Sequence, residues 1–157
     1  MGVEIERKFL VLSEEFKQEA THSAEIRQFY LHSPNKEETL RLRLIDGKAI
    51  FTRKGLSSED GLVRREEEYP LSKEEAEQLL RTPIIGSIEK ERYYIPYEGF
   101  MWEVDCFHGI LEGLILAEVE LSSPTDTPIL PHWIGQEVTG DKRYYNSQLA
   151  IATSRPQ

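Results

Sequence analysis

The sequence predicts a mainly β protein of the α+β class: an eight-stranded antiparallel β-barrel that forms a charged tunnel, with a few helices packed against it. Two observations predict this fold. About eight segments alternate polar with apolar side chains, the period of a β-strand, in which successive side chains point to opposite faces. Most of these segments are joined by hairpin-sized turns, which favours one antiparallel sheet, closed or nearly closed.

The composition limits the class of protein and its partners. The chain has 157 residues, 39% hydrophobic and 30% charged, and residues 1–157 are expected to form a single domain with a hydrophobic core. The net charge of −9 argues against general nucleic-acid binding, which needs a basic surface. The single cysteine, Cys106, has no internal disulfide partner, and no apolar run approaches the ~20 residues that span a bilayer. The charged first strand does not resemble a secretory signal, so we expect a cytoplasmic protein without a membrane partner.

The first half of the chain is predicted to be mostly strands. Alternation predicts strands over residues 1–11, 24–31, 39–45, 48–54 and 62–70. Ser13 is a candidate cap for a short helix through Lys17, and Asp46-Gly47 is a strong hairpin signal. Residues 55–61 are predicted to be a mobile loop. The strand over 62–70 carries charge in both registers, so its period alone does not tell which set faces inward.

The second half adds three strands and two helices. Strands are predicted over residues 88–95, 100–107 and 114–122. Ser72 and Glu75 form a capping-box pattern that opens a helix through Leu80. Residues 123–131 are predicted to be a loop rich in Pro and Thr. Asp141 is a candidate cap for a last helix that reaches Leu149.

The charged side chains of these strands recur at i, i+2 spacing on one face. The basic members are Lys8, Arg41, Arg43, Lys54, Arg64, Lys90 and Arg92. The acidic members are Glu4, Glu6, Glu66, Glu68, Glu103, Asp105, Glu118 and Glu120. A solvated sheet face explains any one pair best, because such residues are mostly exposed. The whole set favours a barrel with the charged face inward and the apolar face outward, where enclosed charges need partners.

The two signs of charge suit two parts of one ligand. Clustered carboxylates without a His or Cys ligand pattern suit hard divalent cations such as Mg²⁺ or Mn²⁺. Clustered Arg and Lys suit phosphate oxygens, Arg through a bidentate fork and Lys as a point charge. The predicted ligand is therefore a metal-bound oligophosphate.

These residues carry a resemblance to a known family. The opening Glu4-x-Glu6-x-Lys8 is similar to the signature of the CYTH superfamily, also called triphosphate tunnel metalloenzymes. The later pieces that agree in order are Arg41-x-Arg43, Thr52-x-Lys54, Arg64-x-Glu66-x-Glu68, Lys90-x-Arg92, Glu103-x-Asp105, Glu118-x-Glu120 and Asp141-Lys142-Arg143-Tyr144. The resemblance spans nearly the whole chain and is greatest to small prokaryotic members that hydrolyse inorganic triphosphate. It implies an eight-stranded antiparallel barrel and an inward register for Arg64, Glu66 and Glu68.

The resemblance also implies a role for each residue. The metal set, for two ions, would be Glu4, Glu6, Glu118 and Glu120. The triphosphate-binding set would be Lys8, Arg41, Arg43, Lys54, Arg64, Lys90 and Arg92. As catalytic groups, Lys90 or Arg92 would stabilise the phosphoryl charge and Glu120 would orient water. Further contributors would be Arg27, Tyr30, Glu66, Glu68, Glu103 and Asp105, with Lys142, Arg143 and Tyr144 as candidates to close one tunnel mouth.

The function predicted is divalent-metal-dependent hydrolysis of inorganic triphosphate. The alternatives in the same superfamily are a class IV adenylyl cyclase that makes cyclic AMP from ATP and a thiamine or nucleoside triphosphatase. The alternative from another class is a non-catalytic sensor of polyphosphate or nucleotide. The expected partner is a small oligophosphate substrate, and a homodimer stays an open option.

Overall fold

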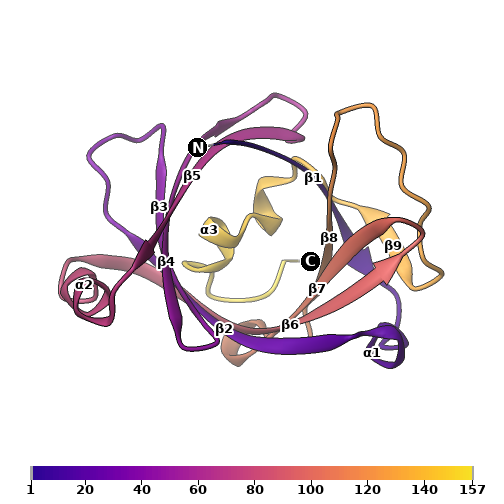
Figure 1. The fold of residues 1–157 in the computed structure, drawn as a ribbon, viewed down its shortest axis with the longest axis horizontal. Helices are drawn as coiled ribbons and strands as arrows, with labels where there is room; N and C mark the ends of the chain where they lie inside the picture. The colour runs from indigo at the N-terminus through magenta and orange to yellow at the C-terminus, as the bar shows by residue number, and fades with distance from the viewer. Residues whose placement is uncertain (1, 157) are drawn as a thin grey trace.

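The computed structural model describes residues 2–156, in which eight strands form a closed antiparallel barrel (Figure 1). Around the barrel the strands are β5 (Val63–Leu71), β4 (Lys48–Ser57), β3 (Thr39–Ile45), β2 (His22–Leu31), β6 (Ile84–Tyr97), β7 (Phe100–Phe107), β8 (Ile115–Glu120) and β1 (Gly2–Val11). A ninth strand, β9 (Ile134–Glu137), pairs with β1 outside the barrel. The predicted fold class is confirmed.

Strand β1 closes the barrel because its two halves have different partners. Residues 2–5 pair with β5, so that Glu4 lies across from Arg64. Residues 6–10 pair with β8, so that Glu6 lies across from Glu120 and Lys8 across from Glu118. The first strand therefore joins two elements that are far apart in the sequence.

The barrel carries its main hydrophobic core on the outside of its wall. Phe9, Trp102 and Val119 are buried on the strand faces opposite the charged residues, and they pack with Phe16 of α1 (Phe16–Glu19) and with Trp133. On the other side, α2 (Lys73–Leu79) packs over strands β4 and β5 and has the predicted capping box. Within residues 2–156, no helix has the length and apolar character needed to cross a membrane. The outward apolar face predicted from the sequence is thus the face that is packed.

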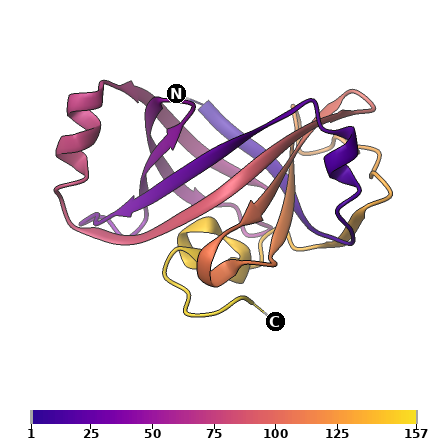
Figure 2. The same ribbon diagram turned by 90° about the horizontal axis from the view of Figure 1, so that it is seen from below.

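The C-terminal segment lies across one end of the barrel. It contains a 3₁₀ turn, η2 (Lys142–Tyr144), and the short helix α3 (Asn146–Leu149), and Figure 2 shows it beneath the strands. Tyr144 and Leu149 are buried against Ile88 and Leu116, which share the inward register of their strands with Lys90 and Glu118. The interior of the barrel therefore changes from charged to apolar toward this end. Another 3₁₀ turn, η1 (Gly109–Leu111), contributes Leu111 to the same cluster.

The predicted boundaries are confirmed for some elements and wrong for others. Strands β3 and β7 have the predicted bounds, whereas β6 is longer than the predicted 88–95 at both ends. Strand β4 continues through Ser57 into the segment predicted as a loop. Strand β9 was not predicted. The single helix expected from Asp141 is divided into η2 and α3, because Tyr145 between them has an extended backbone (φ −68°, ψ 134°).

Two glycines hold the β4–β5 connection against the segment after β9. Gly61 and Gly140 both have positive φ (77° and 80°), and a Cβ on Gly61 would overlap the Gly140 backbone. We expect Gly61→Ala to lower the free energy of unfolding by more than about 2 kcal/mol, from left-handed strain plus overpacking. Urea unfolding measures this loss.

The matched control is Gly99→Ala, because Gly99 has nearly the same φ (81°) but has no neighbour within 4 Å of an added Cβ. This variant should lose only the strain, about 1–2 kcal/mol. Equal losses in the two variants would contradict the close contact between the glycines.

Candidate functional site

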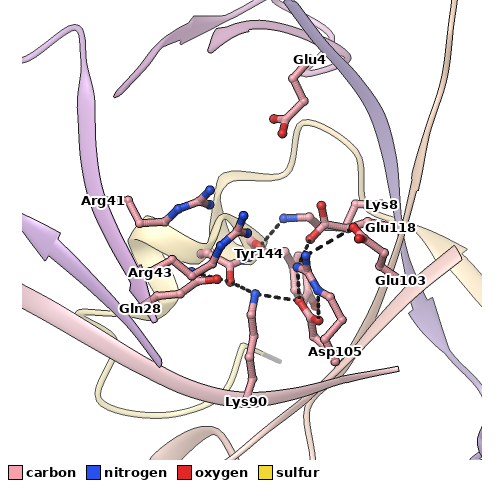
Figure 3. A network of polar contacts seen from close by, with 12 residues as sticks. Glu4, Lys8, Gln28, Arg41, Arg43, Lys90, Glu103, Asp105, Glu118 and Tyr144 are labelled. Carbon is pink, nitrogen blue, oxygen red and sulfur yellow. Dashed lines mark hydrogen bonds and ion pairs between the residues drawn. The ribbon is translucent and has the colours of Figure 1, made fainter. Parts of the chain in front are cut away.

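All eight barrel strands contribute to one cavity of about 260 Å³. Its lining residues from β1 to β4 are Glu4, Glu6, Lys8, Tyr30, Thr39, Arg41, Arg43, Lys54 and Ser57. Those from β5 to β8 are Arg64, Glu66, Glu68, Lys90, Arg92, Glu103, Glu118 and Glu120. Tyr145, Asn146 and Ser147 line it from the C-terminal segment. The cavity thus gathers every predicted metal and phosphate residue at one place, and Figure 3 shows part of this set converging.

The most buried charges in the cavity wall form one ion cluster. The Asp105 carboxylate lies 2.7 Å from Lys90 Nζ and accepts from Arg92 Nε at 2.7 Å and Arg92 Nη2 at 3.0 Å. Burial would raise the pKa of Asp105, but the charges of Arg92 and Lys90 outweigh it and lower this pKa. Burial lowers the pKa of Lys90 to about 8, and the Asp105 charge opposes that shift. Asp105 does not line the cavity and acts from behind it by holding these two cations.

Arg92 is also held from its other side. Its guanidinium lies 3.3 Å from Glu103 and 4.0 Å from Glu118. Burial would lower the pKa of Arg92, but its contacts with Asp105 and the nearby Glu103 and Glu118 charges outweigh this and raise it. Arg92 therefore stays charged and fixed in direction at neutral pH.

The carboxyl groups of Glu6 on β1 and Glu118 on β8 interact with each other, and the nearby cations do not keep both of them ionised. Burial, with the charges of Glu118 and Glu4, raises the pKa of Glu6 well above its usual value. Burial also opposes ionisation of Glu118, but the Lys8 charge, a hydrogen bond with Glu6 and the charges of Arg92 and Lys90 lower its pKa. Glu6 thus tends to hold a proton that it shares with an ionised Glu118.

A second carboxylate pair joins β1 to β5. Lys54 Nζ donates to both Glu4 oxygens, at 3.1 and 3.3 Å. Burial opposes ionisation of Glu4, but Lys54 and a hydrogen bond with Glu66 lower its pKa. Burial together with the hydrogen bond and charge of Glu4 raises the pKa of Glu66 to about 8. At neutral pH this pair, like the one before it, is expected to share a proton.

Two arginines of β3 have unused hydrogen-bond donors. Arg43 and Arg41 lie 3.6 and 4.0 Å from Glu68, and Arg41 also donates to Thr52 at 3.3 Å. The Nε groups of Arg41 and Arg43 are buried without a hydrogen-bond partner. Burial, together with the charges of Arg41 and Arg92, lowers the pKa of Arg43. An anion that accepts from these donors would relieve both the repulsion and the unmet hydrogen bonds.

The remaining basic residues border the cavity with backbone partners. Lys8 Nζ donates to the Tyr144 carbonyl at 3.0 Å, close to the C-terminal segment. Arg64 donates to the Gly55 carbonyl at 2.6 Å and to Thr39 at 3.0 Å. Both keep further donor hydrogens for a ligand, because Lys has three and Arg has five.

Three of the further candidate residues lie away from the cavity. Arg27 is on the outer face of β2, 58% exposed and 3.6 Å from Glu89, because it has the opposite register from Tyr30. Lys142 and Arg143 do not line the cavity either, and Arg143 pairs with Asp141 at 2.7 Å. Tyr144, the third residue predicted to close a tunnel mouth, is buried in the C-terminal segment that lies across this end, whereas Lys142 and Arg143 stay without an assigned role.

Sequence reasoning missed several lining residues. Thr39 shares the register of Arg41 and Arg43, so extending that alternation by one step would have found it. Tyr145, Asn146 and Ser147 follow no strand period, and no signal in the sequence marks them.

The donor set suits a hard divalent cation in its chemistry, because oxygen ligands of negative charge are those that such cations prefer. Glu6 lies directly across from Glu120, and Glu103 across from Glu118, in neighbouring strands. Like charges at such positions are destabilising unless something neutralises them. Within residues 2–156, no three carboxylate, His or Cys groups are assembled at distances that would hold an ion. Binding of a cation here would displace the protons that the raised pKa values of Glu6 and Glu66 favour.

Comparison with known proteins gives consistent matches. The model of the CYTH domain family matches residues 2–148. An inorganic triphosphatase of Acetivibrio thermocellus is 42% identical over 95% of this chain and 94% of its own length. An inorganic triphosphatase of Nitrosomonas europaea is 40% identical over 95% of this chain and 97% of its own length. A crystal structure of an inorganic triphosphatase superposes with a TM-score of 0.67 at 34% identity, covering 96% of this chain and 99% of that one.

Proposed function

The chain belongs to the CYTH domain family, and from this premise we propose that it hydrolyses inorganic triphosphate inside the cavity of its barrel. The observation that carries the proposal is the cavity itself, in which carboxylates and cations from all eight strands converge. The relatives of 40–42% identity, both inorganic triphosphatases, support the same reaction. Water adds to a phosphorus, a phosphoanhydride bond breaks, and orthophosphate and pyrophosphate leave.

The triphosphate would be bound by the basic side of the cavity. The proposed residues are Lys8, Arg41, Arg43, Lys54, Arg64, Lys90 and Arg92. The unmet Nε donors of Arg41 and Arg43 support this role, because phosphate oxygens are strong acceptors for arginine. Tyr30 lines the cavity as well and would donate its hydroxyl hydrogen to a phosphate oxygen.

Metal binding is assigned to the acidic side. Glu4, Glu6, Glu118 and Glu120, on the neighbouring strands β1 and β8, would hold Mg²⁺ or Mn²⁺, and two ions are proposed for this set of four carboxylates. When bound, such ions neutralise phosphate charge and lower the pKa of a coordinated water. Glu66, Glu68 and Glu103 would orient the cations and water around this set.

Three side chains are proposed to act on the reacting groups. Lys90 and Arg92 would stabilise the charge on the transferring phosphoryl group, and Asp105 fixes both of them from behind. Glu120 would accept a hydrogen bond from the attacking water and so direct it at phosphorus. No covalent intermediate is needed in this scheme.

A substrate panel tests the function. The protein is incubated with triphosphate, ATP or thiamine triphosphate and with Mg²⁺ or Mn²⁺, and orthophosphate, pyrophosphate and cyclic AMP are all measured. We expect orthophosphate and pyrophosphate from triphosphate at the highest rate. Cyclic AMP from ATP at a higher rate would identify a cyclase instead. Tight triphosphate binding by calorimetry without turnover in folded protein would identify a sensor.

The effect of Mg²⁺ concentration on activity should vary with pH, because protons compete with the cation for the carboxylates. The pKa of Glu66 is about 8 and that of Glu6 is raised. Below about pH 8, a cation that binds here must therefore displace protons from these carboxyl groups. At limiting Mg²⁺, activity should rise with pH through about 8, by up to about tenfold per pH unit for each proton displaced. Rates across pH 6–9 at low and saturating Mg²⁺ measure this.

Saturating Mg²⁺ should move the rise to lower pH. The control is Glu66→Gln, which lacks the titrating carboxyl at position 66. Its activity at limiting Mg²⁺ should rise less steeply with pH. A pH profile that does not change with Mg²⁺ concentration would contradict proton competition.

A further inference from the structure

Gln28 is a buried polar residue that the proposed reaction leaves without a role. It lies on β2 with no exposed surface, and it is not among the residues that line the cavity. Its Oε1 atom has no hydrogen-bond partner, which costs about 1–3 kcal/mol in a buried site. An apolar side chain of similar size would avoid this cost. The amide nitrogen is therefore the part of Gln28 that needs an explanation.

The Gln28 nitrogen has two acceptors for its two hydrogens. Nε2 donates to the Tyr30 hydroxyl oxygen at 3.0 Å and lies 3.5 Å from Asn146 Oδ1. Asn146 Oδ1 also accepts from Lys90 Nζ at 2.8 Å. These contacts form one chain from Lys90 through Asn146 and Gln28 to Tyr30, at the inner end of the cavity.

The direction of every hydrogen bond in this chain follows from Lys90. An ammonium group can only donate, so Asn146 must present its oxygen to Lys90 and not its nitrogen. That oxygen favours the Gln28 amide nitrogen as its second neighbour, since the reversed amide would place two acceptors together. The nitrogen in turn donates to Tyr30, whose hydroxyl oxygen is then an acceptor.

The hydrogen of the Tyr30 hydroxyl is left for a ligand. Among the hydrogen bonds of residues 2–156, this hydroxyl only accepts, and the side chain lines the cavity while being 3% exposed. We propose that Gln28 is a positioning residue that directs the Tyr30 O–H into the cavity, where it donates to a phosphate oxygen of the substrate. This inference rests on the proposed function of the cavity.

A double-mutant cycle tests the assignment. The variants are Gln28→Met, which keeps the volume and removes the amide, Tyr30→Phe, which removes the hydroxyl, and the pair. Tyr30→Phe should lower kcat/KM for triphosphate about 10- to 100-fold, the value of a hydrogen bond to a charged group. Gln28→Met should lower it about tenfold in the wild-type background and less than about twofold in the Tyr30→Phe background.

The cycle separates positioning from a merely structural role. If Gln28 only supports the fold, the fold-decreases in kcat/KM of the two single variants should multiply in the double variant. Such independence would overturn the assignment. An unchanged kcat/KM in Gln28→Met would overturn it as well. Thermal unfolding identifies a variant that fails to fold, and Gln28→Leu then takes the place of Gln28→Met.

A binding readout keeps this inference distinct from the proposed function. The same four proteins are titrated by calorimetry with imidotriphosphate, in which nitrogen replaces the bridging oxygens. If the effects of Gln28→Met and Tyr30→Phe on imidotriphosphate affinity are coupled, the positioning role is supported. If, in addition, no phosphate is released from triphosphate, the hydrolase proposal is overturned. Triphosphate hydrolysis with no coupling in either readout would overturn the positioning role alone.

Discussion

Replacing Asp105 by Asn should lower the free energy of unfolding by about 3–5 kcal/mol, the cost of leaving a buried ionic partner unpaired. Asp105 is 1% exposed and holds both Lys90 and Arg92 at 2.7 Å. Asn keeps the shape but not the charge, so Lys90 and Arg92 would lose their shared buried counterion and keep only the longer contacts of Arg92 with Glu103 and Glu118. Urea unfolding at pH 7 measures the loss.

The chain offers a matched control for this variant. Arg7 and Glu137 form the same two-bond fork, at 2.9 and 2.7 Å, but on side chains that are 26% and 37% exposed. Glu137→Gln should cost less than about 1 kcal/mol, because water screens the pair. Equal losses for the two carboxylates would show that burial does not govern the Asp105 cluster.

The loss in Asp105→Asn should also depend on pH. The pKa of Lys90 is about 8 in the folded protein and near 10.5 when unperturbed, so the unfolded state binds more protons and stability rises with pH between these values. Removing the Asp105 charge lowers the folded pKa further and extends this interval downward. The deficit at pH 9 should therefore be smaller than the deficit at pH 6.

The largest expected effects on activity are those of Lys90→Met and Glu118→Gln. Lys90 is proposed to stabilise phosphoryl charge, and loss of such a group lowers kcat by about 10²–10³. Glu118 is proposed as a metal ligand, and its loss should lower metal affinity at least about 10- to 100-fold, as found for outer partners of ligands. To separate the two roles, phosphate release is measured from about 0.1 to about 20 times the Mg²⁺ concentration that gives half-maximal activity in the wild type.

The two variants should respond differently to added metal. Raising Mg²⁺ should restore part of the activity of Glu118→Gln and none of that of Lys90→Met. Arg27→Gln serves as the control, because Arg27 lies on the outer face, and it should keep wild-type kcat/KM. If Mg²⁺ rescues Lys90→Met and not Glu118→Gln, the proposed division of roles is wrong.

The sequence predicts the barrel well where alternation is strict and bounded. Residues 39–45 and the centre of 100–107 alternate, and both segments are followed by turn residues, Asp46-Gly47 and His108-Gly109, so their bounds are confirmed. Strand β6 extends beyond the predicted 88–95 and includes Gly86 and Pro96, two residue types that are unusual inside strands. A Cβ at Gly86 would come within 2.6 Å of the Ala150 carbonyl oxygen, so this glycine serves the packing of the C-terminal segment.

The candidate site could be predicted where it lies on strands and not where it lies beyond them. One register on each strand is enough to place Arg41, Lys90 and Glu118 on the same face. Tyr145 and Asn146 reach the cavity through a turn whose shape depends on tertiary contacts, so no local pattern carries them. The apolar inner positions Ile88 and Leu116 were a usable signal, because they interrupt the charged register toward the end that the C-terminal segment covers.

The pairing of β1 with both β5 and β8 also determines when, during folding, the site can exist. Contacts between β1 and β8 join residues near the start of the chain to residues 116–120, and such non-local pairings are slow to form because a long loop must close first. The nascent chain therefore carries Glu4 and Glu6 long before their counterparts are synthesised. A cation held by Glu6 and Glu118 would span this last seam and bind only the closed form, so it would stabilise the ring by mass action. Closure of the barrel and binding of such an ion would then be linked, and added metal would raise the free energy of unfolding.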